Sequence, residues 1–274
     1  MSPWVTKAGR GVRRYAGLLG VLVKIGFMRQ MAYRPHFYLM ITGKVIRIAL
    51  VFFFFQAIFL KVDRIGSWTY DEVLLLFATF HIVDYLMSIT FHRTLAYQLP
   101  GRVQSGELDW RMLLPVNLLF FVSFEEVDII DLFSFLPSLA FLMYVFHRLD
   151  FAFSWPQLAA YVLLMANALL FVFAVVLITA TVSFWTTQSY GLSRIFDNLL
   201  KIGRYPLDIF QGFWKIVFVY FLPLVLIAQV PSQALLRALD PKFLLAAMGA
   251  SAFFLVLALA FWRVGLRNYV SASS

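Results

Sequence analysis

Three charged side chains within otherwise apolar stretches are the first candidates for chemistry: Lys44, Arg47 and Asp84. Charged groups inside a bilayer are costly, and they usually mark paired or water-lined sites. Arg47 precedes Lys61 by 14 residues and Asp84 follows Asp71 by 13 residues, so both lie about 20 Å from the same interface at the helical rise per residue. This register predicts that Arg47 and Asp84 face each other, either as a structural ion pair or as the polar lining of a substrate path. Lys44 is expected nearer the inner surface, which its long stem can reach.

A second candidate is a group of four carboxylates, Glu125, Glu126, Asp128 and Asp131. Their spacing could present oxygen ligands to a cation. Acidic residues at a helix N-terminus are also stabilised by the helix dipole, and the group directly precedes an apolar stretch. The sequence favours a capping and interfacial role, with a metal site as the alternative.

Motifs for nucleotide hydrolysis and for other hydrolytic chemistry are absent from the sequence. Gly43 and Lys44 form the only Gly-Lys pair, but Val45 follows them, so no phosphate-binding loop is present. The nearest approach to a nucleophile and base is Ser88 with His92, four residues apart, which we interpret as a polar pair near the inner interface. We therefore expect no catalytic residue, no cofactor site and no metal site in this chain.

The composition defines the environment in which these residues must act. The chain of 274 residues is 62% hydrophobic and 14% charged, with 31 Phe and no Cys, whereas soluble domains are about 45–50% apolar and about 25% charged. The net charge of +9 resides in the first 60 residues, which hold nine Lys or Arg and no acidic residue. A disulfide scaffold, a Cys-ligated metal protein and a disordered tail are excluded. Because the basic segment leads straight into an apolar stretch, no nucleic-acid partner is expected, and the sequence predicts an integral membrane protein.

The elements that position these residues are predicted to be six membrane-spanning helices of 18 to 31 residues, where a span requires ~20. Pro137 in the third and Pro223 in the fifth are expected to kink or shift their helices. The predicted spans are residues 37–60, 72–97, 129–146, 155–185, 213–230 and 243–262.

The distribution of Lys and Arg predicts the orientation. With a cytoplasmic N-terminus, the inner segments hold fifteen basic residues and the short outer loops hold five, so both termini are expected in the cytoplasm. Tyr15–Met31 is too charged to span and suits a helix in the anionic inner interface; a signal peptide is less favoured because Lys24 interrupts its apolar part and no cleavage pattern follows. The fold class is an all-α polytopic membrane protein, with a basic cytoplasmic segment (1–35), one transmembrane permease domain (36–266) and a cytoplasmic tail (267–274).

Three segments carry a resemblance over nearly the whole chain. They read GSWTYDEV (66–73), QSGELDWRMLLP (104–115) and KIGRYPLDIF (201–210). Together they resemble an ATP-binding-cassette (ABC) type-2 family permease, in the branch beside the daunorubicin-resistance and viologen-export permeases. An Arg usually precedes the Pro of the second segment in that branch, whereas this sequence has Leu114, with Arg111 nearby.

The resemblance implies a six-helix permease half that pairs with a second permease subunit, as a homodimer or a heterodimer. It also implies two cytoplasmic ATPase subunits, which bind the ATP and Mg. The segment after the second span would be the ATPase-coupling loop, comprising Gly106, Glu107, Leu108, Asp109, Trp110, Arg111, Leu113 and Pro115. The segment before the fifth span would be a second cytoplasmic motif, comprising Arg204, Tyr205, Pro206 and Asp208.

The sequence thus predicts a non-catalytic permease subunit of a bacterial ABC exporter in the cytoplasmic (inner) membrane, surrounded by lipid and moving a hydrophobic or amphiphilic substrate. One alternative is an intramembrane enzyme that processes lipids or peptides. Another is a secondary transporter coupled to an ion gradient, with Asp84 as the coupling carboxylate.

Overall fold

The computed structural model describes residues 3–31, 34–149, 154–186, 189–237 and 240–269. Within these ranges the chain forms helices and short connections, and no strand. The long helices are α1 (Pro3–Met31), α2 (Arg34–Phe59), α3 (Tyr70–Met87), α7 (Ile129–Arg148), α8 (Trp155–Thr181) and α12 (Pro241–Asn268). The shorter elements are η1 (Ser88–Gln98), α4 (Leu99–Gln104), α5 (Leu108–Met112), α6 (Leu118–Phe124), η2 (Val182–Phe184), α9 (Ser189–Leu200), η3 (Lys201–Arg204), η4 (Leu207–Ile209), α10 (Gly212–Ile216), η5 (Val217–Phe221), η6 (Leu224–Leu226) and α11 (Gln229–Leu236).

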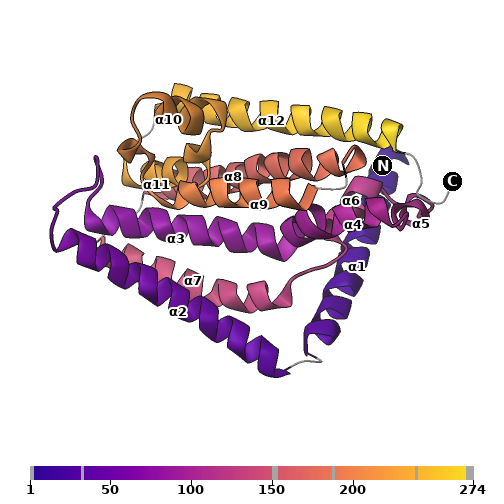
Figure 1. Ribbon diagram of the computed structural model, residues 1–274, viewed down its shortest axis with the longest axis horizontal. Helices are drawn as coiled ribbons and strands as arrows, with labels where there is room; N and C mark the ends of the chain where they lie inside the picture. Colours follow the sequence, from indigo (N-terminus) through magenta and orange to yellow (C-terminus); the bar gives the residue numbers. More distant parts are fainter. Residues whose placement is uncertain (1–2, 32–33, 150–153, 187–188, 238–239, 270–274) are drawn as a thin grey trace.

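The long helices α2, α3, α7, α8 and α12 run along the long axis of the molecule (Figure 1). At one end lie the α2–α3 connection, α10 and α11, and we name this the α2–α3 end. At the other end lie α4, α5 and α6 with the start of α1 and the end of α12, and we name this the α5 end. Helix α1 leaves the bundle and extends across the α5 end.

Five helices in the described residues are long and apolar enough to cross a membrane: 37–59, 70–104, 129–148, 155–184 and 241–268. They coincide with the first four predicted spans and the sixth. Pro137 lies within α7, which continues through it as one helix. The chain is therefore a multi-pass membrane protein.

Helix α3 is the centre of the bundle. In the most apolar part of 70–104, 78% of the residues are buried, compared with 11% in α2 and 17% in α12. Thr69 and Glu72 form a capping box at its start, with Thr69 N donating to Glu72 Oε2 at 2.8 Å. Inside the bundle, Thr79 and the Tyr161 hydroxyl of α8 are hydrogen-bonded at 2.9 Å. Ser232 of α11 donates to Thr79 at 3.2 Å, so one buried polar chain joins three elements that are distant in sequence.

The predicted interfacial segment Tyr15–Met31 forms the second half of the longer helix α1. The ring of Tyr15 contacts Phe120 of α6 edge to face, at 4.7 Å between centroids. Near the end of α1, a Cβ on Gly26 would stand 2.8 Å from the carbonyl oxygen of Val127. Only a residue without a side chain permits this approach, which sets α1 directly against the start of α7.

The predicted fifth span is wrong as a single helix. Residues Gly212–Phe221 are helical, but the helix stops before Pro223, and Leu222 takes φ −117° and ψ 85°. Proline lacks the N–H that a helix needs and disfavours helical geometry in the residue before it. The chain then turns through η6 into α11, and Arg237 Nη2 lies 3.8 Å from Glu72 Oε1 at the start of α3.

Residues 212–236 therefore form a broken hairpin. Its first limb follows Asp208, whose carboxylate contacts the α2–α3 connection, and its second limb ends beside the start of α3. The hairpin as a whole thus begins and ends at the α2–α3 end. From the α5 end, the chain reaches the α2–α3 end through α9 and then η3. Helix α9 lies alongside α8 (Figure 1).

Candidate functional site

The most densely connected polar region is a network of charged side chains at the α5 end, which we name the α5-end network. It brings together residues from α1, η1, α4 and α5 around the turn that precedes α7. Its members are Arg29, Arg93, Gln98, Arg102, Arg111, Glu125, Glu126 and Asp128.

Arg111 and Glu125 form the core of this network. Arg111 Nε lies 2.9 Å from Glu125 Oε2, and Arg111 Nη2 lies 2.9 Å from Glu125 Oε1, which makes a bidentate pair. Arg111 Nη1 also donates to the carbonyl of Glu107 at 2.7 Å. Arg102 adds a second guanidinium to Glu125 at 2.6 Å. Since the side chain of Arg111 is 5% exposed, this is a buried, geometrically specific ion pair.

The Arg111–Glu125 ion pair fixes the orientation of the segment 106–113. Gly106 has φ +75°, a backbone conformation in the left-handed region that favours glycine, and it turns the chain into α5. Leu108 is fully buried and anchors the inner side of α5. Trp110 is 48% exposed and Leu113 is 84% exposed. The segment therefore presents large apolar side chains to the outside, and the Arg111–Glu125 ion pair holds its inner side in place.

Helix α1 joins the same network. Arg29 Nη1 contacts Glu126 Oε1 at 2.6 Å, and Gln98 also donates to the Glu126 carboxylate. Burial opposes ionisation of Glu126, but the hydrogen bonds from Gln98 and Arg29 and the charges of Arg29 and Arg93 outweigh it, so the pKa of Glu126 lies below its ordinary value. The carboxylate is thus held ionised between α1 and η1.

The four clustered carboxylates all face cationic partners, a pattern that their own spacing did not reveal. Asp128 accepts from Arg93 Nη1 at 3.0 Å and, as the N-cap of α7, from the backbone N–H of Asp131 at 3.2 Å. Asp131 pairs with Lys44 of α2. These contacts assign the cluster capping and bridging roles at the start of α7.

The intramembrane charges also come together across helices. Arg47 Nη2 lies 3.9 Å from Asp84 Oδ2, so the two side chains face each other between α2 and α3. Lys44 lies one turn away from Arg47, with its ammonium 5.5 Å from the centre of the Tyr85 ring and in contact with Asp131. The partner of Lys44 was not predicted, because Asp131 is 87 residues further along the chain.

A small cavity of about 200 Å³, lined by polar and apolar side chains, adjoins Asp84. His92 Nε2 lies 2.8 Å from Asp197 Oδ1 of α9, and the Tyr97 hydroxyl donates to the same carboxylate. Ser88 lines the cavity too, but among the described residues no hydrogen bond joins it to His92. Asp197 is a site residue that the sequence analysis missed, since nothing near it in the chain marks it.

The segment 204–208 lies against the α2–α3 connection. Asp208 Oδ2 accepts from Ser67 Oγ at 2.8 Å and from Trp68 Nε1 at 3.0 Å, both in the α2–α3 connection. A Cβ on Gly66 would stand 3.0 Å from the Asp208 Cβ. The predictions that 61–71 is an outer loop and that 204–208 is a cytoplasmic motif are therefore incompatible, because both segments lie at one end of the bundle. The guanidinium carbon of Arg204 lies there 4.8 Å from the centre of the Tyr205 ring.

The apolar helical bundle, with ion pairs between its helices and a charged network at one end, defines a multi-pass helical membrane protein. A family model described as "ABC-2 family transporter protein" matches residues 45–273. The chain belongs to this ABC-2 transporter family, as the resemblance of its motifs predicted. A search of curated proteins gave no match.

Proposed function

We propose that this chain is the transmembrane subunit of a bacterial ABC exporter, and that separate cytoplasmic ATPase subunits dock on the segment 106–113. The observation that carries the proposal is the two-sided construction of this segment. Its inner side is anchored by buried Leu108 and by the Arg111–Glu125 pair. Its outer side offers Trp110 and Leu113 to a partner.

Such a surface suits a protein partner, because exposed Trp in a fixed position is a typical anchor of binding energy. Docking alone would not drive transport. A movement of the docked ATPase must also be transmitted to the membrane-spanning helices. The Arg111–Glu125 pair ties the segment to the start of α7, and Arg29–Glu126 ties α1 to the same turn. A movement imposed on α5 is thereby passed to α7 and α1 together.

In this proposal the α5 end faces the cytoplasm, in agreement with the excess of Lys and Arg near it. The protein works in the inner membrane with a second permease subunit, as a homodimer or a heterodimer. ATP and Mg are bound by the ATPase partners. The cargo is hydrophobic or amphiphilic, which fits the apolar interior of the bundle and its few charged side chains.

Co-purification tests the docking surface. We expect the double variant Trp110→Ala/Leu113→Ala to lose most of the ATPase that purifies with the wild type, while the membrane yield stays unchanged. Trp155→Ala is the matched control, because Trp155 is an 83% exposed Trp that opens α8 far along the chain from α5. Equal recovery of ATPase with the double variant and the wild type would reject the proposed surface.

A second candidate rests on the small cavity beside Asp84. Its carboxylate and the His92–Asp197 pair line one small space within the bundle, as a proton or cation site of a secondary transporter would require. Transport into proteoliposomes without any ATPase, abolished by Asp84→Asn, would favour this function. Processing of a lipid or peptide by the isolated chain, abolished by Ser88→Ala, would favour an intramembrane enzyme instead.

A further inference from the structure

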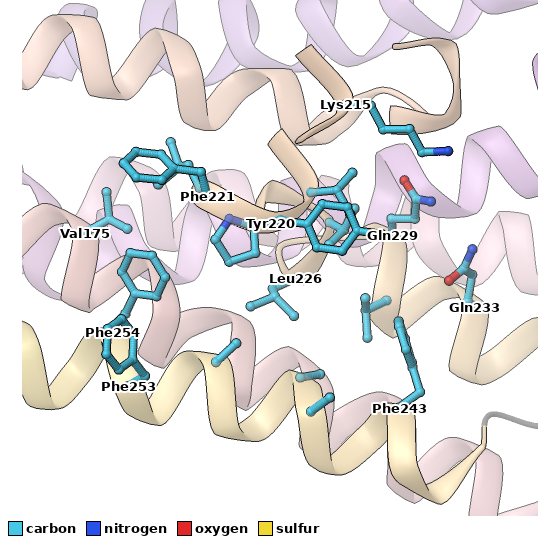
Figure 2. A pocket seen from close by; sticks show the side chains of 18 of the residues that line it. Val175, Lys215, Tyr220, Phe221, Leu226, Gln229, Gln233, Phe243, Phe253 and Phe254 are labelled. Atoms are coloured by element: carbon cyan, nitrogen blue, oxygen red, sulfur yellow. The ribbon is translucent and has the colours of Figure 1, made fainter. Parts of the chain in front are cut away.

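A second, larger cavity than the one beside Asp84 is separate from the charged sites of the α5 end. It has a volume of about 920 Å³ and lies between α8, α12 and the broken hairpin 212–236 (Figure 2). Cavities that take small organic ligands measure about 300–1,000 Å³. Its walls are mainly apolar, and the hairpin supplies the wall that two packed helices alone would lack.

The cavity has a polar end and an apolar end. Lys215, Gln229 and Gln233 gather on one side of it, and Phe221 and Phe254 lie on the other (Figure 2). The polar side chains lie toward the start of α12, which belongs to the α2–α3 end, and the aromatic ones lie deeper along the helix.

The length of the cavity matches a lipid chain. Phe243 and Leu257 of α12 both line it and are 14 residues apart, which corresponds to about 21 Å along the helix. This exceeds half of the ~30 Å hydrocarbon core of a bilayer. An acyl chain entering from the interface at the α2–α3 end would therefore extend past the Phe254 ring toward the midplane.

The charges at the polar end select the sign of a head group. Asp208 also lines the cavity, but its carboxylate already accepts hydrogen bonds from Ser67, Trp68 and Gln229. Lys215 is exposed and, among the described residues, makes no hydrogen bond or ion pair. An ammonium without a partner at the mouth of an apolar cavity is complementary to an anionic group on an apolar chain.

We infer that this cavity binds an anionic glycerophospholipid from the leaflet at the α2–α3 end. One acyl chain fills the apolar part, and the phosphate lies beside Lys215 with Gln233 as a further donor. Tyr220 and Phe221 of the hairpin, which are 74% and 79% exposed, pack on this chain. The bound lipid supports the hairpin, and its binding does not depend on the ATPase proposed above.

Photo-crosslinking tests this site in the full-length protein. The protein is placed in nanodiscs of phosphatidylcholine that contain a trace of phosphatidylglycerol with a diazirine at the end of one acyl chain. We expect labelled peptides from 219–226 and 246–257. Ala250→Phe fills the cavity and should remove most of this label, whereas Ala252→Phe, on the exposed face of α12, should leave it unchanged.

A second pair of variants tests the head group without changing the packing. Lys215→Gln should reduce the preference for phosphatidylglycerol over an equally labelled phosphatidylcholine by about fivefold, the usual contribution of one Lys near an anionic lipid surface. Lys242→Gln is the control, because Lys242 lies at the start of α12 but does not line the cavity.

Three results would overturn the inference. The first is equal labelling of Ala250→Phe and wild type, or equal loss in Ala250→Phe and Ala252→Phe, which would mark ordinary lipid around the protein. The second is an unchanged head-group preference in Lys215→Gln. The third is crosslinking of the cavity residues to another copy of the chain in place of lipid, which would make this face a subunit interface.

Discussion

Replacing Glu125 by Gln is the sharpest test of how the segment 106–113 is held. The amide of the Glu125→Gln variant would keep the shape of the side chain but lose the charge that two guanidinium groups share. Arg111 would then be a buried cation whose remaining carboxylate neighbour is the exposed Glu107, while Arg102 would keep its hydrogen bond to Gln98 at 2.7 Å. We therefore expect the loss to fall mainly on α5.

The size of the effect follows from the burial of the pair, since the side chains of Arg111 and Glu125 are 5% and 15% exposed. Removing one partner of a buried ion pair costs about 3–5 kcal/mol, and the amide retains one acceptor, which places the expected cost near the lower end, about 3 kcal/mol. If local opening of the loop becomes easier by that amount, its amides exchange with solvent about 100-fold faster.

Hydrogen–deuterium exchange of the protein in nanodiscs measures this, with peptides from 105–114 as the reporter and peptides from α8 as the internal reference. Glu107→Gln is the matched control. Its carboxylate lies 3.4 Å from the same Arg111, but its side chain is 58% exposed, and exposed pairs contribute about 0–1 kcal/mol. Equal loop exchange in the two variants, or equal acceleration in α8, would refute the reasoning.

Three further outcomes are expected. Gly26→Ala should destabilise the packing of α1 by about 1–3 kcal/mol, because its Cβ would stand 2.8 Å from a backbone carbonyl. Gly20→Ala should leave this packing unchanged, because the space around Gly20 is open. Faster amide exchange in α1 is expected for the first variant and not for the second. The pKa of Glu126 lies below its ordinary 4.5, so the ionised carboxylate stabilises the fold above pH 4.5, and this stability is lost as the pH falls through the lowered pKa. Over that pH range the amides of 15–31 should lose protection, after correction for the intrinsic pH dependence of exchange. Glu126→Gln should remove this pH dependence. Asp208→Ala removes the acceptor of three hydrogen bonds and should accelerate amide exchange in the α2–α3 connection about tenfold.

The sequence predicted the long elements well, because each is defined by its own residues. A run of about 20 apolar residues marks a span wherever it packs, and five predicted ranges coincide with long apolar helices. Arg47 and Asp84 could be brought together by counting residues from the ends of two adjacent helices. That argument needs only the helical rise and a shared interface.

The remaining contacts depend on segments that no local pattern connects. Asp197 meets His92 across 105 residues, and nothing in the sequence around Asp197 indicates it. Hydropathy also cannot tell a span from a hairpin that returns to its starting end. Pro223 is the local signal for the hairpin, because proline ends the helix there, but the same proline is compatible with a kink inside one span. The sequence singles out both Arg111 and Glu125, but no local pattern pairs them.

The contrast between the buried α3 and the exposed α2 sets two different evolutionary constraints on helices of nearly equal hydropathy. On α3, neighbours touch every face, so substitutions are filtered by volume and shape, and an Ile in place of a Leu has a cost. On α2, much of the surface would meet fluid chains that adapt to any apolar outline, so substitutions are filtered by polarity alone. Sequence drift should therefore be rapid but chemically uniform on α2, and slow on α3.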